Sequence, residues 1–389
     1  MDPPQVVERG AGLAGGRDRA CYRLPVIAEV RCFRFALGVA LVAAASAGVA
    51  LGTCGAPELA TVPSIAWDGR ALTAVWERGD GRHGATVFAH RFTDVRAGVT
   101  TVGADTPIYH QENGTPMHSP EIASDAAGSL VVIVGLLQAQ IAIPLDATGA
   151  VAGPAQPLTS CRSDRSERVC MRACRGAVAF GDGFAFGHLD TWPRAGRGAN
   201  AVAVSFLARD GKTVRDVSVP VAIPSGCALA STGSRLVIAV AEQRMDGAYG
   251  ISIQVVEEFG RDGVWIPDAV RAIALVPTGA DMALLYETRD GALRVARVDD
   301  RGVREQVVLA TDVDAATADL GIGAHGPFVT WIVGQRVVIR DVATAASTRG
   351  TVRGDQPLGT RAVGVGDRCV AAWSASGGAK LGVLSTACP

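Results

Sequence analysis

Lysine and aromatic side chains are scarce in this sequence. Of its 37 basic residues only Lys212 and Lys380 are lysines, and aromatic residues make up 5% of the chain. Acidic residues number 38, so the formal net charge is −1. This balance provides no electrostatic basis for binding nucleic acid or an anionic membrane surface, and we expect no nucleic-acid partner.

Sequence signatures of common enzymes are also absent. The chain has neither Gly-x-Ser-x-Gly nor His-Glu-x-x-His, and no glycine-rich loop precedes a helical pattern. No Cys-x2-Cys pair is present, and the six histidines are not spaced as a metal pair. We therefore assign no catalytic residue, cofactor or metal from the sequence. His118, in the stretch YHQENGTPMHSP, is kept as a candidate ligand contact.

One long apolar run stands near the N-terminus. Residues 35–51 read FALGVALVAAASAGVAL, with Arg31 and Arg34 before them and Cys54 shortly after. A positive segment, a short apolar run and a small-residue exit are typical of a secretory signal, whereas a membrane span needs about 20 residues. We predict a signal peptide over 31–53 and an exported domain over 54–389. Residues 1–30, which have no periodicity, are interpreted as a misassigned start or a disordered segment.

The cysteine at the exit of this run has a specific resemblance. Cys54, with Leu51 three residues earlier, resembles the lipobox of bacterial lipoproteins, although Gly52 and Thr53 depart from its usual pattern. The resemblance implies an acylated Cys54 and a chain anchored to the outer membrane, in the periplasm or at the cell surface. The lipid would be its sole membrane contact. Ordinary signal cleavage and an uncleaved anchor are the alternatives.

A unit of short strands recurs through the rest of the chain. Its starts are roughly 40 to 60 residues apart, the size of a four-stranded propeller blade. Turn dipeptides such as Asp68-Gly69 and Asp290-Gly291 separate the strands. The copies span residues 63–92, 120–146, 176–211, 227–257, 272–302, 320–342 and 361–385. We predict an all-β, seven-bladed β-propeller, monomeric, with six or eight blades less favoured.

The first copy also resembles a known repeat. PSIAWDG (63–69) followed by VWE (75–77) is similar to the degenerate repeats of secreted β-propeller proteins of myxobacteria and their relatives. This resemblance implies a fold and no activity, because propellers host many functions. The seventh copy stops after its third strand, and we predict that residues 57–63 supply the missing outer strand.

Most aromatic residues follow the repeat. The end of the second strand is occupied by Trp76, Tyr286, Trp331 and Trp373, and by His188 in the third copy. Since valine shares this position in other copies, we interpret it as packing between blades. Trp192 falls outside the pattern in what we take as a long loop over 187–199, and is a candidate exposed ligand contact. The stretch 105–119 is a second candidate loop.

Six cysteines follow Cys54. An even number in an exported chain predicts disulfides. Cys369–Cys388 is the first expected pair, since it would tie the C-terminal end to its own blade. The remaining four allow three pairings, of which we favour Cys161–Cys170 with Cys174–Cys227 between adjacent blades. A metal site is the rival interpretation.

Three functions remain open. The first is a non-catalytic module of the cell envelope that binds a protein, peptide or glycan. The second is a glycan hydrolase or lyase with carboxylates in the central funnel. The third is a structural outer-membrane assembly lipoprotein. Carboxylates clustered at one mouth of the channel would favour an enzyme, whereas a narrow apolar channel would favour a binding module.

Overall fold

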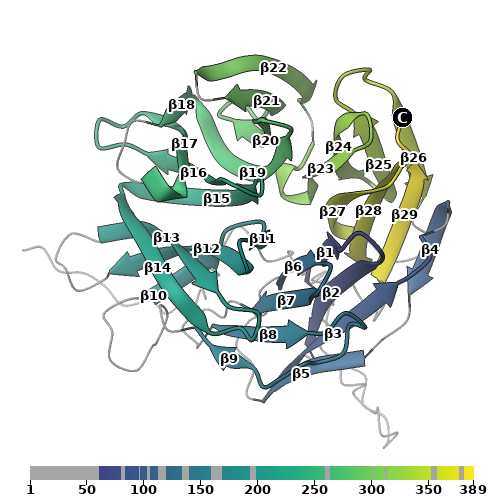
Figure 1. Cartoon of the computed structure of the whole chain (residues 1–389). Coiled ribbons are helices and arrows are strands. Elements are labelled where there is room, and N and C mark those ends of the chain that lie inside the picture. Colours follow the sequence, from purple (N-terminus) through teal and green to yellow (C-terminus); the bar gives the residue numbers. More distant parts are fainter. Residues whose placement is uncertain are drawn as a thin grey trace, which may run out of the picture. The chain divides into compact units, whose positions relative to one another are not determined.

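The chain forms seven antiparallel β-sheets arranged around a central axis (Figure 1). The computed structural model describes residues 61–79, 84–95, 97–102, 106–112, 120–133, 140–158, 169–192, 199–258, 263–299, 301–311, 313–351, 357–375 and 381–389. The innermost strands contact one another in sequence order, and the last contacts the first. The predicted seven-bladed β-propeller is confirmed.

Within each blade the strands run in sequence order from the axis outward, with two exceptions. In blade 3, β10 and β11 share the innermost position, and in blade 7 the outermost strand is β4. Blades 1 and 2 comprise β1 (Ser64–Trp67), β2 (Leu72–Gly79), β3 (Gly84–Phe92) and β5 (Thr106–Glu112), then β6 (Glu121–Asp125), β7 (Gly128–Ile133), β8 (Ile141–Leu145) and β9 (Gln156–Pro157). Blades 3 and 4 comprise β10 (Val169–Ala173), β11 (Val178–Phe180), β12 (Gly183–Trp192), β13 (Ala199–Leu207) and β14 (Thr213–Val221), then β15 (Ile223–Ser231), β16 (Leu236–Gln243), β17 (Tyr249–Val255) and β18 (Val264–Pro267). Blades 5 and 6 comprise β19 (Ala269–Thr278), β20 (Asp281–Thr288), β21 (Leu293–Asp299) and β22 (Gly302–Ala310), then β23 (Asp319–Gly323), β24 (Gly326–Val333), β25 (Arg336–Asp341) and β26 (Ser347–Thr351). Blade 7 comprises β27 (Pro357–Val365), β28 (Arg368–Ala375), β29 (Leu381–Ala387) and β4 (Gly98–Val102), and two 3-10 helices, η2 (Val256–Glu258) and η3 (Ala315–Thr317), lie between strands.

Each blade is buried on both faces by its neighbours. Seven hydrophobic clusters occupy the seven junctions between blades, including the junction of blade 7 with blade 1. In β20, Leu284 and Tyr286 pack toward blade 4, whereas Leu285 between them packs toward blade 6. Successive side chains of a strand point to opposite faces, so the alternation supplies both junctions from one strand.

The repeated aromatic position belongs to these junctions. Trp76, Tyr286, Trp331 and Trp373 are all buried, with 1 to 7% of their surface exposed, and His188 is fully buried. Their interpretation as packing residues is confirmed. Burial of each large side chain contributes about 1.5–3 kcal/mol by area alone, which makes this position a main source of cohesion between blades.

The ring closes differently from the sequence prediction. The outer strand of blade 7 is β4, which pairs with β29 over Gly98–Val102, so the expectation that residues 57–63 supply it is wrong. Figure 1 shows β4 beside β29, after which β5 returns to the edge of blade 1. Thr61 instead links blades 1 and 7, because its N–H donates to the Glu77 carbonyl and its carbonyl accepts from Ser374 Oγ at 2.6 Å.

Two disulfides are present among the described residues. Cys174–Cys227 joins blade 3 to blade 4, and Cys369–Cys388 ties the C-terminal end to β28, as named from the sequence. A Cβ on Gly323 of blade 6 would lie 2.6 Å from Cys388 Sγ, so the second disulfide packs closely on the neighbouring blade. Cys161 and the side chain of Cys170 lie outside the described residues, and their pairing stays a prediction.

Both stretches expected to be functional loops are partly strand. Residues 106–112 form β5, and Trp192 is the last residue of β12, paired with Ala199, so the loop interpretation of these parts is wrong. These polar residues form strands because they pair with a neighbouring strand, and the preference of a residue for a strand depends on its tertiary context.

The described part of the chain contains no apolar helix of the length that a membrane crossing requires.

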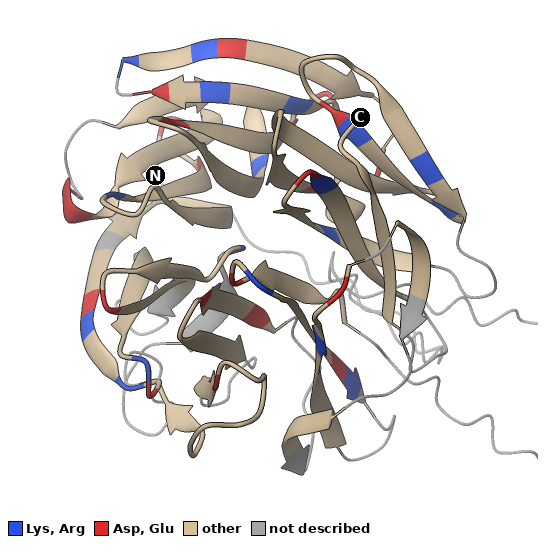
Figure 2. Cartoon of the chain, turned by 45° about the vertical axis from the view of Figure 1, so that its right-hand side comes forward, with Lys and Arg blue, Asp and Glu red and all other residues tan. Residues whose placement is uncertain are grey.

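Charged side chains lie on strands throughout the ring, several of them on its outer side (Figure 2). On blade 5, Arg297 pairs with Asp281 at 2.7 Å and Arg304 with Asp299 at 2.5 Å, all at the surface. Exposed pairs of this kind contribute about 0–1 kcal/mol each. They keep the ring edge hydrated, whereas the apolar junctions supply its stability.

Proline in β4 tests how the ring is closed. Adjacent N–H groups of a strand point to opposite sides, so one of the two residues Val99 and Thr100 donates its N–H toward β29 and the other does not. Substituting both in turn, as Val99→Pro and Thr100→Pro, therefore includes the variant that loses a hydrogen bond to β29. We expect the more damaging of the two to lower the free energy of unfolding by about 3 kcal/mol or more. Urea denaturation followed by tryptophan fluorescence measures this.

The matched controls are Thr348→Pro and Arg349→Pro in β26, the outer strand of blade 6. Its partner β25 is only a short turn away in sequence, so β26 re-pairs at a smaller entropic cost than β4. Equal losses in β4 and β26 would contradict the closing role of β4.

Candidate functional site

A cavity of about 350 Å³ occupies the centre of the ring. Every blade contributes to its lining through its innermost strand or the segment beside it. The lining falls into two parts. Glu121 and Asp319 lie where their innermost strands begin, Arg361 lies in the middle of β27, and Arg175 lies between β10 and β11. Small or apolar side chains lie toward the turns where the innermost strands end.

A buried ion pair joins blades 2 and 7 across this cavity. Arg361 Nη2 donates to Glu121 Oε1 at 2.8 Å, and both side chains are more than nine-tenths buried. The second oxygen, Glu121 Oε2, accepts from Ser64 Oγ and from the backbone N–H of Gly176, each at 3.3 Å. Glu121 thereby connects blades 1, 2, 3 and 7 through one carboxylate.

The innermost strand of blade 3 is interrupted at the cavity. Both β10 and β11 pair with β12 on the same side, and Cys174–Ala177 lie between them. Here the backbone of Arg175 leaves its own blade and forms a parallel bridge with Ala228 of β15. The Cys174–Cys227 disulfide and two backbone hydrogen bonds of Arg175, to Cys227 and Leu229, hold this break against blade 4.

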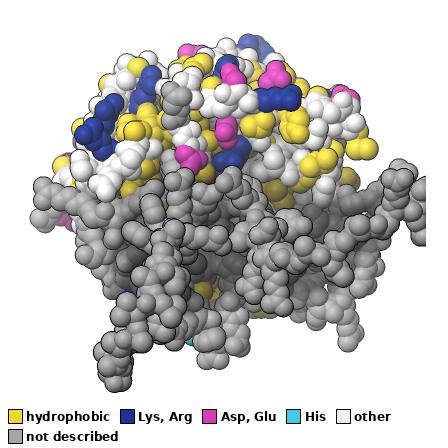
Figure 3. All heavy atoms as spheres, turned by 180° about the vertical axis from the view of Figure 1, so that it is seen from behind, with side chains coloured by type: hydrophobic (Ala, Val, Ile, Leu, Met, Phe, Trp, Pro, Cys, Tyr) yellow, Lys and Arg dark blue, Asp and Glu magenta, His cyan; other side chains and the backbone are white. Residues whose placement is uncertain are grey.

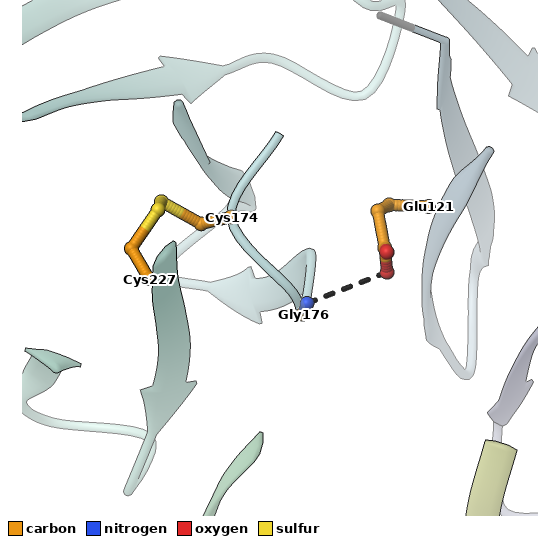
Figure 4. The surroundings of a disulfide bond; sticks show 4 residues. All are labelled: Glu121, Cys174, Gly176 and Cys227. Carbon is orange, nitrogen blue, oxygen red and sulfur yellow. Dashed lines mark hydrogen bonds between the residues drawn. A yellow bond between two sulfur atoms is a disulfide. The ribbon is translucent and has the colours of Figure 1, made fainter. Parts of the chain in front are cut away.

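Gly176 allows the backbone to turn at the interruption between β10 and β11. Its φ of +91° is in a region that L side chains rarely adopt, and a Cβ there would lie 2.5 Å from the Leu229 carbonyl oxygen. Figure 4 shows the result, in which the N–H of Gly176 points at the Glu121 carboxylate and the disulfide lies beyond it. The disulfide therefore fixes the position of a donor to Glu121.

Arg175 reaches from blade 3 to the opposite side of the cavity. Its Nη1 and Nη2 donate to the carbonyls of Ala318 and Ala316, at 2.7 and 3.2 Å, beside η3 of blade 6. Asp319 Oδ1 lies 3.8 Å from Arg175 Nη1, and its Oδ2 accepts from the N–H of Ala362 at 2.8 Å. The two arginines thus span the cavity at one end, together with Glu121 and Asp319. We call these four side chains the channel tetrad.

Burial sets the electrostatics of the tetrad. Desolvation raises the pKa of Asp319 above its ordinary value, against the opposing charges of Arg361 and Arg175. Burial opposes the charge of Arg361, but Glu121 and Asp319 outweigh it and raise the pKa of its guanidinium. One guanidinium nitrogen, Arg361 Nη1, is buried and has no hydrogen-bond partner within the described parts of the chain.

The sequence analysis did not identify any of these four residues. Its named ligand candidates stay predictions, because the side chain of Trp192, at the end of β12, and all of His118 lie outside the described part of the chain. A signal was present in the repeat. Ser64, Asp319 and Arg361 each face the residue just before a buried tryptophan of the second strand, and Glu121 holds the same place in blade 2. Polar residues at one repeat position of the innermost strand point to the channel.

The tetrad is a network of oppositely charged side chains. Among the residues described, no three histidine, cysteine, aspartate or glutamate side chains are grouped to hold a metal ion. On the face of the molecule seen in Figure 3, basic and acidic side chains stand close together among apolar ones. What the channel offers chemically is a set of fixed hydrogen-bond donors and acceptors beside an apolar wall.

Removing one partner of the Glu121–Arg361 pair tests its cohesion. Glu121→Gln leaves Arg361 buried without its counter-charge, and we expect a loss of about 3–5 kcal/mol in the free energy of unfolding. The double variant Glu121→Gln/Arg361→Met removes both charges, and the introduced amide oxygen still accepts from Ser64 and Gly176. It is expected to recover most of that loss. A double variant as unstable as the single one, by urea denaturation, would contradict this account.

The pH dependence of stability tests Asp319, whose neighbours are Arg361, Arg175 and Glu121. Because its pKa is raised by folding, the folded state keeps this proton while the unfolded chain loses it as pH rises above about 4. The stabilisation is full below that pH and is lost as pH rises through the folded-state pKa. We expect unmodified protein to lose stability relative to Asp319→Asn over this range. A difference that stays constant with pH would contradict the raised pKa.

Comparisons with known proteins do not identify a family for this chain. Neither a protein-family model nor a curated protein matches the sequence. Among solved structures, the Dos1 propeller has a TM-score of 0.46 at 9% identity, covering 83% of this chain and 78% of that one. A puromycin hydrolase mutant complexed with PGG has a TM-score of 0.49 at 15% identity, covering 81% and 50%. A Mycobacterium tuberculosis puromycin-hydrolyzing peptidase has a TM-score of 0.49 at 16% identity, covering 82% and 50%. This chain spans about half the length of the two peptidases, and likeness at this level carries no argument about activity.

Proposed function

We propose that this chain is a ligand-binding protein of the cell envelope that binds its ligand in or over the central channel without transforming it. One observation carries the proposal, namely a central cavity lined by all seven blades in which both oxygens of the Glu121 carboxylate already accept hydrogen bonds within the protein. Propellers use such central sites for recognition because the loops and inner strands of all blades converge there. The ligand class is a protein, a peptide or a glycan.

Engagement of the carboxylates argues against general acid–base catalysis. A catalytic acid or base must be free to exchange a proton with the substrate. Both oxygens of Glu121 accept hydrogen bonds within the protein, one of them from a guanidinium. Asp319 is held by a backbone N–H. An enzyme remains the second candidate because two carboxylates do lie at one end of the channel, the arrangement expected of a funnel-mouth hydrolase or lyase.

Turnover separates the two candidates. We expect the purified protein to retain oligosaccharides, peptidoglycan fragments or peptides from envelope extracts and to release them intact, as checked by mass spectrometry. Product formation that falls at least about 100-fold in Glu121→Gln or Asp319→Asn would establish the enzyme instead. The exposed Lys212→Gln is the control for charge change away from the channel.

The export signal completes the proposal. The disulfides are compatible with an oxidising compartment, where such bonds persist. We propose that the mature chain begins at an acylated Cys54 and is held at the outer membrane by that lipid, working as a monomer. Residues 1–60 lie outside the described part of the chain, so this rests on the sequence.

Fatty-acid labelling in a bacterial expression host tests the anchor. We expect label on the unmodified protein and none on Cys54→Ser, which would move from the membrane fraction to the soluble one, because a single reacting thiol carries the lipid. Cys369→Ser is the control cysteine and should keep its label. Label that persists in Cys54→Ser would contradict acylation at this position.

A further inference from the structure

The central cavity has a polar end and an apolar wall, and the two together resemble a site for an amphipathic small group. The polar end is the channel tetrad. The wall is formed by the inner strands toward their ends, chiefly Ile65, Ala66, Val178, Ala179, Val276 and Pro277. These six are partly exposed, and the cavity lining extends to the exposed turn at Gly233. The cavity is therefore lined continuously from the tetrad to a turn at the surface.

The polar end has an unused donor. Arg361 is 7% exposed and lines the cavity, yet its buried Nη1 has no acceptor among the residues that the structure describes. A buried donor left unsatisfied is unfavourable, and buried polar groups in folded proteins are nearly always paired. Glu121 uses Nη2 of the same guanidinium, so an acceptor for Nη1 has to come from elsewhere.

The charge of the polar end favours an anion. Two guanidinium groups face two carboxylates, and desolvation raises the pKa of one of them, Asp319. Where Asp319 holds its proton, the tetrad carries one more positive than negative charge. Carboxylates are the natural partners of a guanidinium with free N–H groups.

We infer that the channel binds a carboxylate carried on a short apolar group, with the carboxylate accepting from Arg361 Nη1 and the apolar group against the wall of small residues. This inference rests on the proposed function and deepens it for a peptide ligand, whereas a free acid would add a ligand class to it. The same chemistry occurs in a free branched aliphatic acid and in the C-terminus of a peptide that ends in an apolar residue. A cavity of about 350 Å³ lies in the range of small-molecule sites.

The experiment compares acids with neutral isosteres on the full exported chain. The probes are 4-methylpentanoate with 4-methylpentanamide, and acetyl-Gly-Gly-Leu with its C-terminal amide, measured by titration calorimetry. We expect at least one acid to bind at least about 10-fold more tightly than its amide, since hydrogen bonds to charged groups are worth more than neutral ones. Tighter binding of the peptide acid would identify a C-terminus, and equal or tighter binding of the free acid would identify a small metabolite-like acid.

Two variants remove the site by different routes. Glu121→Gln/Arg361→Met removes the guanidinium together with its counter-charge, and should abolish the preference for acid over amide. Ala179→Phe fills the wall without touching the tetrad, and should weaken acid and amide alike by about 10-fold or more. The matched control is Ala310→Phe at the end of β22, which does not line the cavity and should bind as the unmodified protein does. Unfolding curves establish that each variant is folded.

Several results would overturn the inference. They are no binding of either acid, equal affinity for acid and amide, and a preference that survives both variants. If the acids fail but an envelope ligand is still retained intact, the inference falls and the proposed function stands. If mass spectrometry shows the peptide probe being cleaved, the proposed function falls, and the relative affinities of uncleavable 4-methylpentanoate and its amide still decide the inference.

Discussion

Burial of both faces of every blade is the constraint on which the rest of this structure depends. In a strand such as β20, Tyr286 packs against one neighbouring blade and Leu285 against the other, so the apolar faces of a blade are buried only when it has two neighbours. An open row of blades would leave two apolar faces in water, at about 25 cal/mol for each Å² exposed. Closure of the ring removes both faces at once, and the channel is its geometric consequence.

Closure draws on chain segments that are far apart. β4 leaves blade 1 to pair with β29, and Thr61 is hydrogen-bonded to both Glu77 and Ser374 of the first and last blades. The tetrad also joins distant segments of the chain, at the central channel, because Arg361 and Glu121 connect blades 7 and 2 there. Such buried ion pairs add little net stability, but each leaves a costly charge if one partner is lost. They are better understood as fixing the relative positions of the blades.

The break in the innermost strand of blade 3 links cohesion to the candidate site. Where β10 ends, the Cys174–Cys227 disulfide and the bridge from Arg175 to Ala228 turn the chain toward blade 4. That turn presents the N–H of Gly176 to Glu121 and sends Arg175 across the cavity to Ala316 and Ala318. A local departure from the repeat thus creates much of the polar end of the channel.

The sequence by itself determined the number of blades, the packing role of Trp76 and its equivalents, and the Cys369–Cys388 disulfide, whereas Cys174–Cys227 was one of three pairings that the sequence left open. These follow from a repeat, a period of two and cysteine spacing, all of which are local patterns. Only the tertiary structure decided that β4 closes the ring and that Glu121, Asp319, Arg175 and Arg361 meet. The four residues are spread over some 240 positions of the chain. They become neighbours because ring closure brings the innermost strands of all blades together around one axis, and no local pattern encodes that convergence.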